Sequence, residues 1–148
     1  MSAKRIVSLV PSITELLVDL GLEEHIVGVT KFCVHPEHLR KNTTIVGGTK
    51  NLRLEVIRQL QPELILANKE ENVREQVEAL AAEFKVFTSD IGNFEEALLM
   101  IKTVGEITDR LPEAEALITQ INQAKSRFEA VNPNNSRPYR TLYLIWQK

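Results

Sequence analysis

The sequence predicts an α/β fold in which a layered, parallel-sheet lobe is followed by a long helix. Two observations predict it. Between residues 5 and 88, short β-branched runs alternate with amphipathic helical segments, which is typical of parallel strands joined by crossover helices. After Asp90 the strand signals stop, and apolar residues recur at helical spacing for about forty residues.

Composition narrows the class of protein. The chain has 148 residues, 43% of them hydrophobic, which suits one packed domain of ordinary size. The net charge is −2, and no basic stripe indicates a nucleic-acid partner. No window approaches the roughly 18 to 20 apolar residues of a membrane span. Cys33 is the single cysteine, so a disulfide within the chain is impossible.

The first predicted unit is a buried strand at Arg5–Val10 followed by a helix. Pro11 ends the strand, and Ser12 with Glu15 three residues later matches a capping box. An apolar stripe then continues to Gly21, which is expected to end the helix.

The remaining elements follow in the same alternation. We expect strands at 26–29, 44–46, 63–67 and 86–88, helices at 54–60 and 72–84, and an irregular stretch at 30–42. Helical patterns from Phe94 to Thr108 and from Ala114 to Val131 are interrupted by Pro112, which marks either a junction or a kink. If collinear, the two pieces would span roughly 60 Å. A further strand is predicted at 139–146.

Several short motifs carry a family resemblance. They are RIVSLVPSITELL at 5–17, VGV at 27–29, FCVHP at 32–36, VGG at 46–48, NLRLE at 51–55 and LQPELILA at 60–67. In this order and at these separations they resemble the type III periplasmic binding proteins, the cobalamin, haem and ferric-siderophore receptors of ABC importers. That resemblance implies the first half of a two-lobed protein: an N-terminal lobe at 1–91, a connecting backbone helix or helices at 92–136, and the first strand of a truncated second lobe at 137–148.

The resemblance also implies a function. On this resemblance, the protein is expected to be the substrate-binding component of an ABC importer for a metal-containing ligand: a corrinoid, haem or ferric siderophore. The expected partner is the permease of the importer, and no cofactor is required. We expect no enzyme, since no Gly-x-Ser-x-Gly, P-loop or Gly-x-Gly-x-x-Gly motif is present.

The sequence and the resemblance also give expectations for the cellular compartment and the oligomeric state. The family is periplasmic or lipid-anchored. No signal peptide is recognisable in this chain, so a cytoplasmic ligand sensor or interaction domain of the same fold is the alternative. A terminal strand would expose Leu142, Leu144 and Trp146, and this apolar surface predicts a homodimer.

Candidate ligand-binding residues lie where predicted strands end, because ligands of parallel sheets bind at the carboxyl ends of strands. Ser12 and Thr14 open a helix whose free amides suit an anionic or carbonyl group, or they simply cap it. Asn68, Glu70 and Glu71 follow a strand, and they either contact a ligand or form the acidic start of the next helix.

Phe32 and Thr49 are compared with the cobalamin receptors. The resemblance aligns Phe32 with an aromatic that lies against the flat ligand; the alternative is a phenylalanine packed in the core or a loop. Thr49 occupies a place where those receptors carry a tryptophan, so a large stacking surface is missing.

The segment Cys33, His35 and His38 offers a thiolate and two imidazoles, which could contact a metal at Cys33 or His35. Single Cys and His residues are otherwise packed or solvated. Glu55 aligns by resemblance with a glutamate that projects toward arginines of the membrane permease, where a surface carboxylate gives docking specificity. The alternative is a solvated helix glutamate.

Overall fold

The sheet has five parallel strands, as expected. The computed structural model describes residues 3–131; the strand predicted at 139–146 and the dimer surface around Leu142, Leu144 and Trp146 lie outside the described residues. The strand order is β3-β2-β1-β6-β7, and every neighbouring pair is parallel. The strands are β1 (Ile6–Ser8), β2 (Ile26–Val29), β3 (Thr44–Ile45), β6 (Leu64–Asn68) and β7 (Val86–Ser89).

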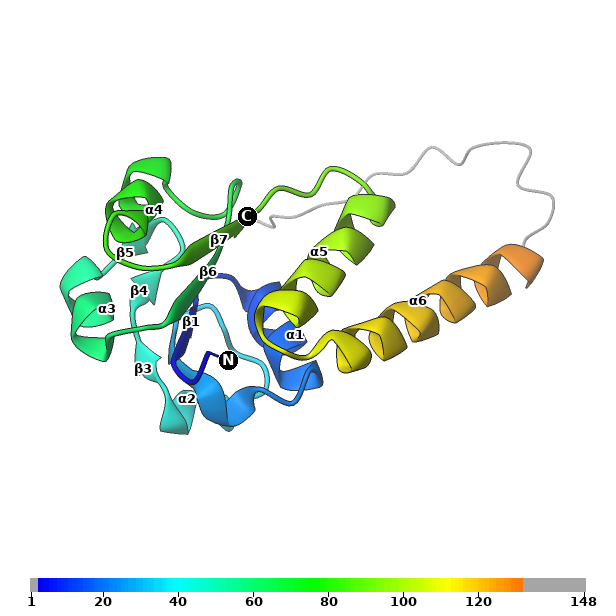
Figure 1. Ribbon diagram of the computed structural model, residues 1–148, viewed down its shortest axis with the longest axis horizontal. Helices are drawn as coiled ribbons and strands as arrows, with labels where there is room; N and C mark the ends of the chain where they lie inside the picture. The colour runs from blue at the N-terminus through cyan, green and yellow to red at the C-terminus, as the bar shows by residue number, and fades with distance from the viewer. Residues whose placement is uncertain (1–2, 132–148) are drawn as a thin grey trace, which may run out of the picture.

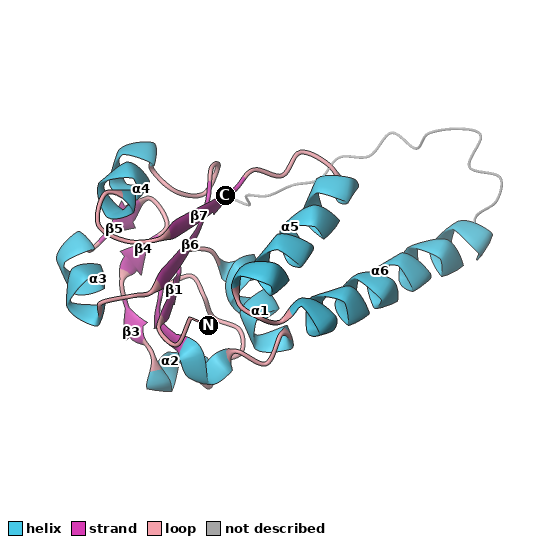
Figure 2. Ribbon diagram, in the orientation of Figure 1, coloured by secondary structure: helices cyan, strands magenta, loops and turns pink. Residues whose placement is uncertain are grey.

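Helices cover both faces of this sheet (Figures 1 and 2). In Figure 1, α1 and α5 lie on one side of the strands, and α3 and α4 on the other. Their bounds are α1 (Pro11–Asp19), α3 (Leu54–Leu60), α4 (Arg74–Ala81) and α5 (Phe94–Ile107), with a short α2 (Leu39–Asn42) and a 3₁₀ turn η1 (Glu23–His25). The α2 turn lies within the stretch predicted to be irregular.

The two central strands form the centre of the core. Ile6 and Val7 of β1, and Ile65 and Leu66 of β6, are fully buried. A strand buried on both faces reads as a continuous apolar run, which explains why these segments were recognisable from sequence alone.

The start of α1 differs from the prediction. The helix begins at Pro11, its N-cap is Val10 with extended backbone, and no side chain caps it. Ser12 is exposed within the first turn, so the capping box predicted from Ser12 and Glu15 is wrong. Proline fixes φ near the helical value and lacks an N–H, so it suits the first helical position.

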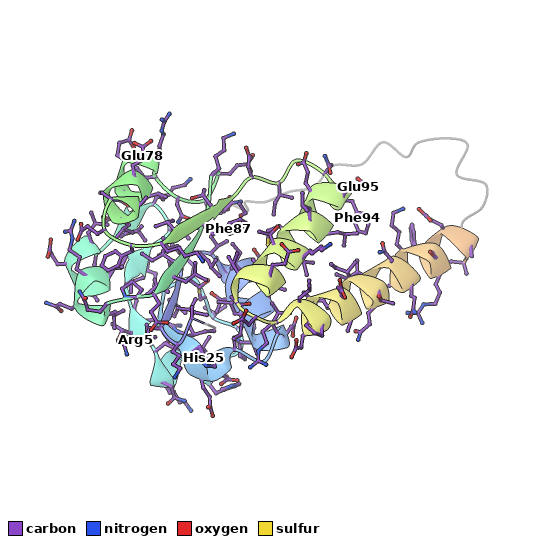
Figure 3. The ribbon with its side chains drawn as sticks, in the orientation of Figure 1. Arg5, His25, Glu78, Phe87, Phe94 and Glu95 are labelled. Atoms are coloured by element: carbon purple, nitrogen blue, oxygen red, sulfur yellow. The ribbon has the colours of Figure 1, made fainter. Side chains whose placement is uncertain are left out.

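The helical segments after Asp90 meet at a junction and are not collinear. Thr108 ends α5, Asp109 takes a left-handed φ of 57°, and α6 (Leu111–Val131) begins two residues later. In Figure 3, Phe94 at the start of α5 lies on the side facing α6, and Lys125 Nζ is 5.4 Å from its ring centroid. The helices therefore form an antiparallel hairpin, and α6 extends away from the sheet (Figure 1).

A glycine sets how closely this hairpin closes. A Cβ placed on Gly105 would lie 2.5 Å from Ala114 Cβ and 3.0 Å from the Arg110 carbonyl oxygen. Both Gly105 and Ala114 are buried. Within the described residues, no helix combines the length and apolar character needed to cross a membrane.

We predict that Gly105→Ala destabilises the protein by about 1–3 kcal/mol, because the added methyl forces the two helices apart and this cost exceeds the gain in helix propensity. Urea unfolding followed by circular dichroism measures it. Gly92→Ala is the control, since its new Cβ would meet only the flexible end of Glu96, and we expect a change within about 0.5 kcal/mol. A Gly105→Ala protein as stable as the wild type would contradict the close approach.

Candidate ligand-binding groove

The sheet has a topological switch point between β1 and β6. From β1 the chain proceeds to β2 and β3 on one side, and β6 and β7 lie on the other side. The connections that follow adjacent strands therefore diverge at the carboxyl edge, which is where open α/β sheets bind ligands.

Asn72 links the chain segments that meet at this switch point. Its Oδ1 accepts a hydrogen bond from the Asn68 amide at 2.9 Å, and its Nδ2 donates to the carbonyl oxygens of Thr49 at 3.0 Å and Leu9 at 3.3 Å. Asn72 is only 5% exposed. One buried amide side chain thus ties together three segments: the end of β1, the 49–50 turn and the end of β6.

Asn68 shapes the loop that carries Asn72. Its Oδ1 accepts from the amides of Glu70 at 2.9 Å and Glu71 at 3.1 Å, and its Nδ2 donates to Ser89 Oγ at 3.1 Å. These bonds occupy the side chain of Asn68 within the protein. The turn leaves the Glu70 and Glu71 side chains exposed, and Glu71 is the one that lines the groove described next.

The three hydrogen bonds of the Asn72 side chain to Asn68, Thr49 and Leu9 are called the clasp below. A groove of about 770 Å³ opens beside it. Its walls are the loop after β2 and the small hairpin of β4 (Gly47–Gly48) and β5 (Asn51–Leu52), with the start of α1 at one end. The lining residues are Pro11, Lys31, Phe32, Ile45, Gly47, Gly48, Thr49, Lys50, Asn51, Arg53 and Glu71.

The hairpin wall requires its glycines. Gly47 has a φ of 111°, and a Cβ there would lie 2.4 Å from the Asn51 carbonyl oxygen. A Cβ on Gly48 would lie 3.3 Å from both Lys31 Cε and Phe32 Cε2. Glycine at these two positions lets the hairpin turn tightly and lets the side chains of Lys31 and Phe32 lie against it.

Two of the predicted ligand-binding residues meet in this groove. Phe32 is 51% exposed, so its ring is available for contact rather than packed in the core. Thr49 is 7% exposed and contributes to the lining, while its carbonyl oxygen is held by Asn72. They come from separate loops brought together by the sheet.

Thr14 and Cys33 lie in the core instead. Thr14 Oγ1 is 2.8 Å from Ser8 Oγ and 3.1 Å from Cys33 Sγ, and the Thr30 hydroxyl is 3.3 Å from the same sulfur. Thr14 is fully buried and Cys33 is 1% exposed. Their polar atoms are used to satisfy one another, as buried polar groups require. This geometry does not support the ligand contacts predicted for either residue.

The two histidines near Cys33 do not join it. His35 is exposed, and His38 Nε2 lies 2.6 Å from Glu23 Oε1 on the surface. Across the described residues, no group of three His, Cys, Asp or Glu side chains could hold a metal ion. Cys33 is buried whereas His35 and His38 are exposed, so the side chains of the Cys-x-His-x-x-His segment do not converge on one metal position and the geometry does not support the predicted metal contact.

Glu55 lies in the first turn of α3 with its side chain 81% exposed. Its Oε1 is 2.5 Å from Arg58 Nη1, and Arg58 also donates to Glu83 from Nε at 2.9 Å and from Nη2 at 2.7 Å. The hydrogen bonds from Arg58 lower the pKa of the Glu83 carboxyl. The three side chains form an exposed ionic cluster on the α3–α4 side of the sheet.

Sequence reasoning did not single out the charged residues of the groove or the residue that supports it. Lys31, Lys50 and Arg53 line the groove, and Asn72 supports it. Lys31 and Lys50 each neighbour a residue that was singled out, so the charge of those loops was a usable signal. Nothing local distinguishes Asn72 from any polar residue at a helix start, because its partners at Leu9 and Thr49 are distant in sequence.

The family described as "Periplasmic binding protein" matches residues 6–148, and the chain belongs to it. It is a family of binding proteins rather than of enzymes. The chain is 32% identical over 120 residues to the vitamin B12-binding protein of Photorhabdus laumondii, covering 80% of this chain and 43% of that protein. It is also 32% identical over 120 residues to an uncharacterized ABC transporter substrate-binding lipoprotein, YvrC, of Bacillus subtilis, covering 78% and 37%.

Solved structures agree on the fold. A possible iron-binding, periplasmic solute-binding protein of Staphylococcus epidermidis superposes with a TM-score of 0.82 at 27% identity, covering 91% of this chain and 54% of that one. A periplasmic haem-binding protein of Pseudomonas aeruginosa gives 0.79 at 25% identity, covering 92% and 50%. The chain spans less than half the length of the two curated relatives and about half of these structures.

We predict that Asn72→Ala destabilises the protein by about 2–4 kcal/mol, because it leaves the buried carbonyl oxygens of Leu9 and Thr49 without their donor. Thermal or urea unfolding measures the change. Asn42→Ala, at an exposed position of α2, should stay within about 0.5 kcal/mol. Equal effects of the two substitutions would show that the clasp does not hold the groove.

Proposed function

We propose that this chain provides the groove-bearing lobe of a substrate-binding component that delivers a metal-containing ligand, such as a corrinoid, haem or ferric siderophore, to an ABC importer. The observation that carries the proposal is the open groove with a half-exposed phenylalanine at the carboxyl edge of a rigid parallel sheet, in a member of the periplasmic binding protein family. Relatives named for vitamin B12 and haem support the ligand class.

The contact would be made by shape and desolvation. The ring of Phe32 supplies a flat apolar surface that loses water when a planar or bulky chelate covers it. Thr49 lies deeper, and the clasp at Asn72 holds the supporting turns in place before a ligand arrives, which lowers the cost of ordering them. No bond of the ligand needs to change.

The partner proposal concerns the exposed start of α3, which follows directly after the groove residue Arg53. We infer that Glu55 docks on the permease of the importer, with the protein on the periplasmic or lipid-anchored side of the membrane. Arg58, itself held by Glu83, pairs with the Glu55 carboxylate at the exposed start of α3. Such a carboxylate contributes orientation and encounter rate more than affinity.

Ligand binding is tested by titrating the purified chain with cyanocobalamin, haemin and ferric siderophores, followed by visible absorbance. We expect saturable binding of at least one of them. Binding of none of these chelates would contradict the proposed function.

Phe32→Ala should weaken binding of that ligand about tenfold, through the loss of apolar area that the ligand covers. Leu99→Ala removes another exposed large apolar side chain, on α5, and should leave the affinity unchanged. Affinity unaffected by Phe32→Ala would remove the phenylalanine from the site.

Docking is tested with the importer that transports the ligand so identified. Glu55→Gln should leave ligand affinity unchanged and lower receptor-dependent uptake several-fold, with a smaller difference at high salt because exposed charges are screened. Glu24→Gln is the control, an exposed glutamate in η1. Uptake that is undiminished by Glu55→Gln would place the docking surface elsewhere.

A further inference from the structure

The groove carries an excess of positive charge in a chain that is negative overall. Its lining includes the cations Lys31, Lys50 and Arg53 and a single carboxylate, Glu71. The whole chain has a net charge of −2. The local sign is therefore opposite to that of the molecule, and a concave surface focuses such a field on whatever enters it.

Each cation is placed by the fold. Lys31 follows β2, and its Nζ is 5.1 Å from the centroid of the Phe32 ring. Lys50 lies in the turn between β4 and β5 and donates to the Glu70 carbonyl oxygen. The amide of Arg53 donates to the Val46 carbonyl oxygen at 2.8 Å, which fixes its backbone at the end of β5. The cations come from three separate connections between elements and line one groove.

Among the described residues, these charges are free of ion pairs with carboxylates. Within residues 3–131, no carboxylate forms a salt bridge with Lys31, Lys50 or Arg53. Three exposed cations that line the same groove as an aromatic ring can each take an oxygen anion of a ligand whose body covers the ring.

We propose, on the basis of the function proposed above, that this groove selects a negatively charged metal chelate over an uncharged one. The chelate has a body that covers Phe32 and carries carboxylate or catecholate oxygens at its edge, which pair with Lys31, Lys50 and Arg53. Phe32 is the aromatic residue of the lining, so apolar contact on this wall is limited and charge decides between ligands of similar size.

The test uses the full chain and ligands matched in metal and size but not in charge. A ferric tris-catecholate is anionic and a ferric tris-hydroxamate is uncharged; haemin adds an anionic ligand whose charge comes from carboxylates, and cyanocobalamin adds a neutral corrinoid. We expect an anionic ligand to bind at least about tenfold tighter than the neutral ones at low salt, with the preference shrinking as salt rises. Comparison of the catecholate with haemin distinguishes the two sources of anionic oxygen.

Charge variants assign the effect to residues. Lys31→Gln, Lys50→Gln and Arg53→Gln should each weaken binding of the anionic ligand about two- to fivefold, as expected for exposed charge contacts, and should leave the neutral chelates unaffected. Lys102→Gln, which removes the same charge from an exposed position on α5, should change neither.

The outcomes separate this inference from the function on which it rests. Binding of cyanocobalamin or the hydroxamate as tight as that of the anionic ligands, with no effect of the three substitutions, overturns the charge selection and leaves the proposed function standing. Binding of no chelate at all overturns the proposed function, and the charge selection with it.

Discussion

The buried side-chain amide of Asn72 fixes the strand-end loops of this protein relative to one another. The side chain of Asn72 accepts from the amide that ends β6 and donates to the carbonyl oxygens of Thr49 and Leu9. The backbone groups it satisfies come from segments that diverge at the switch point of the sheet. Without this side chain the buried carbonyl oxygens of Leu9 and Thr49 would lose their donor, and the turn between β4 and β5 would lose one of its links to the sheet. The groove beside it depends on that turn, since the hairpin supplies one wall.

The groove and the proposed docking surface are connected through a short piece of chain. β5 ends at Leu52, Arg53 lines the groove, and α3 begins at Leu54 with Glu55 in its first turn. The groove cation Arg53 and the carboxylate proposed to dock on the permease are therefore held by consecutive backbone hydrogen bonds. The Arg53 amide bonds to Val46, and the Ile57 amide bonds to Arg53. This rigid connection suits a receptor whose surface must keep a defined geometry relative to its ligand.

Much of the fold could be predicted because hydrophobic patterning is local. The parallel sheet, the bounds of β2 at 26–29 and the bounds of α3 at 54–60 agree with the patterns read from the sequence. The start of α1 was wrong because two helix-start signals compete there. The helix begins at Pro11 rather than after Ser12, because the φ of proline is already helical and its missing N–H needs no cap. The interruption at Pro112 was ambiguous in sequence, and the close contact of Gly105 with Ala114 resolves it as a hairpin.

The sequence by itself determined the class of fold, the family and the position of Phe32 on a strand-end loop, because each rests on short-range pattern. Only the tertiary structure decided which loop residues face outward. Cys33 and Phe32 are adjacent, yet one lies in the core against Thr14 and the other in the groove. It also brought Lys31 and Arg53 to a common surface and gave Asn72 its partners. These relations depend on contacts between residues distant in the chain, and the packing of the sheet and its helices sets them.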